Sequence, residues 1–182
     1  MAEIELRSIH LHWLENGDPF TDLCVHGGIY LRIGDFLISD GTDLDWTVST
    51  AAFNLLRTLF QDQPLIGREP LIPHCGFTMW PSNSEPDGLY IPNCDIGINW
   101  SLKHEPGRLI HEFANGTRVI TNIKDWKLAV CQFADEVDVF LHSAWPKAID
   151  DEQDRRGFEH FISVWQMRRL EADLIDGNAR IN

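Results

Sequence analysis

The stretch from Asp35 to Phe60, D-F-L-I-S-D-G-T-D-L-D-W-T-V-S-T-A-A-F-N-L-L-R-T-L-F, joins an acidic segment to the clearest helix start in the chain. Ser49 is the expected N-cap, because its hydroxyl can accept a hydrogen bond from the free amides of the first helical turn. From Ala52 to Phe60 the apolar residues recur at helical spacing, which predicts one buried face. The stretch therefore predicts a charged loop attached directly to a core helix.

The composition favours one globular domain. The chain has 182 residues, of which 43% are hydrophobic, so it can bury a sizeable core without staples. Its formal net charge is −13 and its pI about 4.8, which argues against nucleic acids and anionic membranes as partners. A basic protein is the partner class that this charge permits.

Cysteine usage and the amino terminus indicate a cytoplasmic protein. The four cysteines include no C-x-x-C pair, and the first residues lack the basic and apolar regions of a signal peptide. No apolar stretch is long enough to cross a bilayer. We therefore expect reduced thiols and a cytoplasmic location.

Strand-like segments come in two blocks, and helical segments follow each block. The second block reads as a meander that turns at Asn115–Gly116, and a helix follows from Asn122 to about Ser143. A third helix is expected after the acidic run that starts at Asp150. This order predicts an α+β fold with a largely antiparallel sheet and three main helices packed against it. Residues 1–182 are interpreted as a single domain whose last residues, 176–182, are frayed.

Acidic residues concentrate in two windows that together hold ten of the thirteen net negative charges. Such concentration disfavours the compact state by self-repulsion, which a partner of opposite sign would relieve. Trp46 is expected to pack against the sheet and hold the first window in place. An ordinary solvated acidic surface is the alternative. The predicted partner-binding residues are Asp35, Asp40, Asp43, Asp45 and Trp46 in the first window, and Asp135, Glu136, Asp138, Asp150, Asp151, Glu152 and Asp154 in the second.

Soft and imidazole ligands occur in three separate segments, Cys24-x-His26, His74-Cys75 and Cys94-Asp95. Four such groups could form a tetrahedral zinc site. No two cysteines have the tight spacing of a zinc knuckle, which weighs against this interpretation. A metal-dependent enzyme or zinc-stabilised domain therefore stands as the alternative function, with the ligand set Cys24, His26, Cys75 and Cys94.

Motifs for other chemistry are absent. The chain contains no G-x-S-x-G and no phosphate-binding glycine motif. The D-G-T-D-L-D segment lacks the glycine and glutamate that a calcium loop requires at its sixth and twelfth positions. We expect no catalytic residue and no cofactor.

Four strings in the sequence carry a resemblance to a known class of protein: H-G-G-I-Y-L-R-I-G-D, L-D-W-T-V-S-T-A-A-F-N-L-L-R-T-L, L-I-P-H-C-G and C-D-I-G-I-N-W. Over residues 24–165 the chain resembles the immunity proteins of bacterial polymorphic toxin systems. The resemblance implies a binding protein that neutralises a cognate toxin, such as a basic nuclease, by covering its active site. A stand-alone domain whose acidity serves only solubility remains a further alternative.

Overall fold

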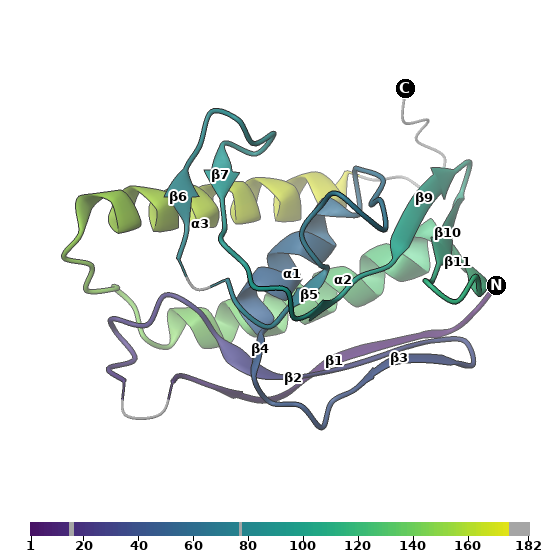
Figure 1. The fold of residues 1–182 in the computed structure, drawn as a ribbon, viewed down its shortest axis with the longest axis horizontal. Helices are drawn as coiled ribbons and strands as arrows, with labels where there is room; N and C mark the ends of the chain where they lie inside the picture. Colours follow the sequence, from purple (N-terminus) through teal and green to yellow (C-terminus); the bar gives the residue numbers. More distant parts are fainter. Residues whose placement is uncertain (15–16, 77, 175–182) are drawn as a thin grey trace.

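The computed structural model shows an α+β fold, as the sequence predicts. A sheet, a pair of helices and a third helix lie in successive layers (Figure 1). It describes residues 1–14, 17–76 and 78–174, so the segment expected to fray, 176–182, lies outside the described residues. All strand pairings among the described residues are antiparallel. No helix in this part of the chain has both the length and the apolar character needed to cross a membrane.

The first block of strands forms a four-stranded sheet along the lower edge of the view in Figure 1. Its strands follow the order β1-β2-β3, and β4 also pairs with β2 at the far end. Apolar side chains of β2 face the helices, and α2 lies directly over β1. The strands are β1 (Ile4–His12), β2 (His26–Ile33), β3 (Phe36–Asp40) and β4 (Trp46–Thr47).

The second block forms smaller sheets rather than one continuous sheet. Along the chain, the strands of two short ladders come after α1, and a three-stranded meander comes next. Helix α2 follows the meander immediately. Pro73 and Gly76, whose φ is 138°, keep β5 and β6 from joining into one longer strand. The elements are β5 (Ile72–Pro73) with β8 (Gly97–Ile98), β6 (Trp80–Pro81) with β7 (Leu89–Tyr90), and β9 (Ser101–Glu105), β10 (Arg108–Glu112) and β11 (Arg118–Asn122).

The central helix α1 (Val48–Arg57) is buried along its whole length and contacts α2 (Ile123–His142) and α3 (Glu152–Asp173). A helix that is covered on every side is a core element, so the single apolar face predicted for it understates its burial. In Figure 1 α1 lies in the middle of the molecule, between the lower sheet and α3.

The predicted N-cap of α1 is wrong. The helix begins at Val48, and its N-cap residue is Thr47, whose side chain makes no cap hydrogen bond. The Ser49 hydroxyl instead accepts the Val25 amide at 3.1 Å, and the Thr47 hydroxyl donates to the His74 carbonyl at 2.9 Å. Because β4 runs straight into α1, tertiary partners on neighbouring segments take the polar groups that a free helix end would use.

The caps of α2 and α3 are local. The Asn122 side chain accepts the Lys124 amide, and the Asp151 carboxylate accepts the amides of Gln153 and Asp154. The acidic first turn expected for the third helix is therefore confirmed, with Asp151 as its N-cap.

The segment from β6 to β7 is docked on α3. The Trp80 indole donates to Asp154 at 3.0 Å, and Arg168 pairs with Asp87 at 2.5 Å. At Gly157 the backbones approach so closely that a Cβ atom would lie 1.6 Å from the Met79 carbonyl oxygen. These contacts fix the segment that connects β5 to β8 in the sequence.

A buried histidine, His111, is hydrogen-bonded within the meander, and its ring packs edge-on against Trp126 of α2, with 4.9 Å between ring centroids. Trp100 Nε1 donates to His111 Nδ1 at 3.1 Å, and His111 Nε2 lies 2.9 Å from Thr121 Oγ1. Because an indole N–H is only a donor, Nδ1 must be unprotonated, and Nε2 therefore carries the proton and donates to Thr121. Burial lowers the pKa of His111 to about 3, so the ring is neutral at ordinary pH.

Candidate functional site

The acidic loop, residues Asp40–Asp45, connects β3 to β4 and is ordered by its own side chains. Asp40 Oδ1 accepts the Thr42 amide at 2.9 Å and the Thr42 hydroxyl at 2.7 Å. Asp43 Oδ1 accepts the Asp45 amide at 3.0 Å. The hydrogen bond from the Thr42 hydroxyl holds the pKa of Asp40 below its usual value. These short-range bonds give the loop a defined shape.

The three aspartates of the acidic loop, Asp40, Asp43 and Asp45, are exposed and carry unneutralised charge. Within the described residues none of them forms an ion pair. The predicted member Asp35 lies apart, at the turn between β2 and β3. Asp35 lies five residues before Asp40, at the opposite end of β3, roughly 17 Å away along the extended chain. The structure therefore groups only three of the first four predicted aspartates.

Trp46 anchors the acidic loop to the core. Its side chain is 7% exposed, and its backbone pairs with Gly27 of β2. The ring lies edge-on to His74, with 6.1 Å between ring centroids. The expected packing of Trp46 is thus present, and its burial means that Trp46 positions the loop while presenting little surface of its own.

Two of the three predicted acids of α2, Asp135 and Asp138, are engaged within the protein. Asp135 accepts two hydrogen bonds from Arg169 of α3, at 2.6 and 3.0 Å, and this bonding raises the pKa of Arg169. Asp138 lies 3.3 Å from His142, while burial raises the pKa of the Asp138 carboxyl. Glu136 is exposed and has no ion pair among the described residues.

The acids at the start of α3 are also largely committed. Asp151 caps the helix, Glu152 pairs with Arg155, and Asp154 accepts the Trp80 indole. The remaining member, Asp150, is exposed. Arg169, which binds Asp135, lies 17 residues beyond Glu152, roughly 25 Å along the helix axis. The second window therefore does not form one surface, and most of its acids stabilise α3.

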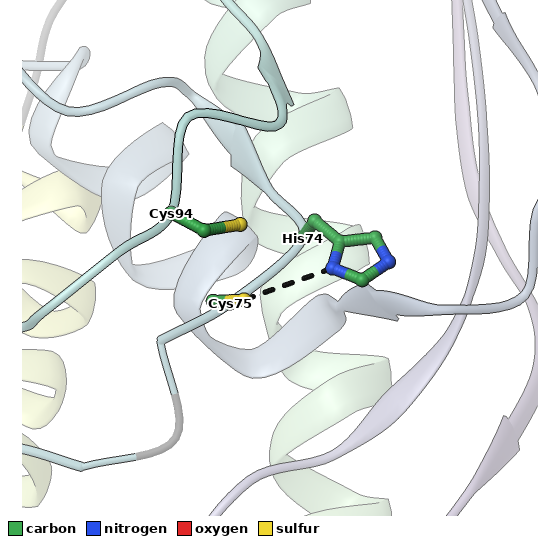
Figure 2. Close-up of side chains that lie close together, drawn as sticks. All are labelled: His74, Cys75 and Cys94. Carbon is green, nitrogen blue, oxygen red and sulfur yellow. Dashed lines mark hydrogen bonds between the residues drawn. The ribbon is translucent and has the colours of Figure 1, made fainter.

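A cluster of three metal-ligating side chains lies on the other side of Trp46. His74, Cys75 and Cys94 place one ligand atom each within 4.8 Å of one another, and all three are half-buried (Figure 2). Cys75 Sγ lies 3.7 Å from His74 Nδ1, and Figure 2 shows the Cys94 sulfur directed toward the same space. The proximity of the two thiols lowers the pKa of Cys94 and raises that of Cys75.

The β5–β8 ladder explains why residues so distant in sequence meet. Ile72 faces Ile98 and Pro73 faces Gly97, and the His74 amide extends the ladder to the Ile96 carbonyl at 3.2 Å. Continuing this antiparallel register brings Cys75 next to the segment that carries Cys94. The two arms of the cluster thus leave the same end of one ladder.

The metal ligand set predicted from the sequence is corrected at two positions. Cys24 is fully buried, its thiol donates to the Gly76 carbonyl at 3.2 Å, and burial raises its pKa strongly. His26 lies 3.7 Å from Asp22 and pairs with Thr47 in the sheet. The structure joins Cys75 and Cys94 with His74 instead. The adjacent His74-Cys75 pair was visible in the sequence, but its pairing with Cys94 depends on the ladder register.

Comparisons of the chain with protein-family models, curated proteins and solved structures found no match.

Proposed function

We propose that this chain is an acidic binding protein that neutralises a basic protein, in the manner of the bacterial toxin-immunity proteins that its sequence resembles. The acidic loop is the part proposed to meet the partner. The observation that carries the proposal is the state of its three aspartates, which are exposed, free of ion pairs among the described residues, and ordered by the loop's own hydrogen bonds.

Charge that is already fixed in space supports binding in two ways. Unpaired carboxylates accelerate the approach of a basic partner through long-range attraction. Because Trp46 and the Asp40 hydrogen bonds order the loop beforehand, less conformational entropy is lost on association. A basic nuclease is a suitable toxin, because its substrate-binding surface is positive and would attract the loop.

The experiment compares two variants with the same change in net charge. The loop variant is Asp40→Asn, Asp43→Asn and Asp45→Asn, and the control variant is Glu3→Gln, Glu159→Gln and Glu171→Gln, all of them exposed positions. Proteins captured by the wild-type chain from its own cells would be identified, and the association rate of each basic candidate would then be measured at several salt concentrations.

The loop variant should slow association on the order of tenfold at low salt, and the control variant should slow it much less. The same loop variant should fail to protect cells from the captured protein's toxicity. Equal association rates for the two variants, or a rate that does not fall with salt, would show that the acidic loop does not meet the partner.

A further inference from the structure

We propose that His74, Cys75 and Cys94 bind a zinc ion and leave its fourth coordination position open. This inference is independent of the proposed function, because it concerns the cluster beside the acidic loop and not the loop's charge. Two thiolates and one imidazole form a soft ligand set, which suits zinc and disfavours the oxygen-seeking ions magnesium and calcium.

The spacing of the ligand atoms agrees with a tetrahedral site. Zinc bonds of about 2.3 Å to sulfur and about 2.05 Å to nitrogen place these two atoms roughly 3.6 Å apart at the tetrahedral angle. The observed separation of Cys75 Sγ and His74 Nδ1 is 3.7 Å. All three ligand atoms lie within 4.8 Å of one another, and two sulfur ligands of a tetrahedral zinc ion lie roughly 3.8 Å apart, so binding requires the Cys94 thiol to move by at most about 1 Å.

The surroundings hold the ligands from both sides. Two hydrogen bonds fix the His74 backbone: its amide donates to the Ile96 carbonyl, and its carbonyl accepts from the Thr47 hydroxyl. The neighbouring Gly76 carbonyl accepts bonds from the Thr50 hydroxyl, at 2.7 Å, and from the Cys24 thiol. A metal bound here would join two chain segments that contain little regular structure, and would thus stabilise them against local opening.

The open position follows from the number of ligands and from their exposure. The cluster offers three protein ligands within the described residues, and all three remain half-exposed. Structural zinc sites have four protein ligands, whereas sites with three protein ligands complete the tetrahedron with water or a ligand from outside. Binding exchanges the two thiol protons for the metal, so each zinc bound releases two protons when both cysteines start as thiols.

The test uses the reduced full-length chain, purified without chelator. Zinc content is measured by elemental analysis, and affinity by competition with a chromophoric chelator. Cobalt(II) serves as a spectroscopic probe, because tetrahedral cobalt–thiolate sites absorb visible light. The variants are His74→Asn, Cys75→Ser and Cys94→Ser, and the control is Cys131→Ser, a cysteine of α2 outside the cluster.

We expect about one equivalent of zinc in the wild type and in Cys131→Ser, with affinity lowered at least on the order of 100-fold in each cluster variant. Circular dichroism of each variant without metal separates loss of a ligand from loss of folding. The proposal is overturned if the reduced wild type binds no zinc, if Cys94→Ser binds it as tightly as the wild type, or if Cys75 and Cys94 form a disulfide that no reductant converts to a zinc-binding form.

Discussion

Two polar clusters that contain a histidine differ in how far their groups satisfy one another. In the closed network, Trp100, His111 and Thr121, the imidazole accepts one hydrogen bond and donates another while the residues around it exclude water. In the open cluster, His74, Cys75 and Cys94, the sulfur atoms have only weak, long contacts and remain half-exposed. A closed network specifies the fold, because opening it leaves buried polar groups unpaired. An open cluster keeps ligand atoms available for an external group.

The largest expected effect is the loss of unfolding free energy when acid protonates His111 and so breaks the closed network. The pKa of His111 is lowered from 6.5 to about 3 by burial, so the unfolded chain takes up a proton before the folded chain does. Stability linked to this residue is therefore complete above about pH 6.5 and is lost as pH falls toward 3, by on the order of 5 kcal/mol over the whole window. Urea unfolding at a series of pH values measures this loss.

Other carboxylates also titrate in acid, so the decisive quantity is a difference between variants. His111→Gln removes the proton uptake and should show a shallower pH dependence than the wild type, although it is less stable at neutral pH. Identical slopes for His111→Gln and the wild type would mean that His111 is not held neutral by the fold.

An intermediate effect is expected where the open cluster meets the core. Trp46→Ala removes a buried indole that contacts both the sheet and His74, and should cost about 3 kcal/mol of unfolding free energy. Amide hydrogen exchange in residues 40–45 should accelerate in the variant, because the anchor of the acidic loop is lost.

Ile96→Ala provides the control for this change. Its side chain is 58% exposed and lies in the same part of the fold, so its removal should change stability by only about 0.5 kcal/mol. If the two variants had equal denaturation midpoints, Trp46 would not anchor the loop.

The smallest effect separates carboxylates that the fold uses from those that it leaves free. Asp151→Ala deletes the N-cap of α3 and should cost about 1 kcal/mol. Asp45→Ala deletes one exposed carboxylate of the acidic loop and should stay within about 0.5 kcal/mol of the wild type. Thermal unfolding of both variants measures the difference, and a larger loss for Asp45→Ala would assign that residue a role in stability.

The elements with local signals could be predicted from the sequence. Helix α2 begins after Asn122 as expected, and the acidic start of α3 supplies its own cap. These signals act over one helical turn, within reach of sequence inspection. Ser49 does not cap α1, because its hydroxyl accepts a hydrogen bond from the amide of Val25, 24 residues earlier in the chain. Such a partner is determined by the tertiary fold, so the residues next to Ser49 in the sequence do not predict it.

The candidate sites could be predicted only in part, for the same reason. Charge counting identified the acidic loop, but it could not distinguish free acids from Asp135, which binds an arginine 34 residues away. The residue types marked Cys75 and Cys94 as candidate ligands, but they did not reveal the strand register that brings the two together. The ladder decides that His74 replaces Cys24 and His26, because it fixes which segments leave it side by side.

The close approach at Gly157 has a consequence for how this sequence can vary. Helix propensity favours alanine over glycine inside a helix by about 1 kcal/mol, yet a methyl group at Gly157, in the second turn of α3, would overlap the Met79 carbonyl. Position 157 should therefore stay glycine in any diverging lineage that keeps this fold, even where the exposed residues beside it change. Glycine at this point of α3, together with the His-Cys pair directly after β5 and the cysteine before β8, gives a pattern by which distant relatives could be recognised.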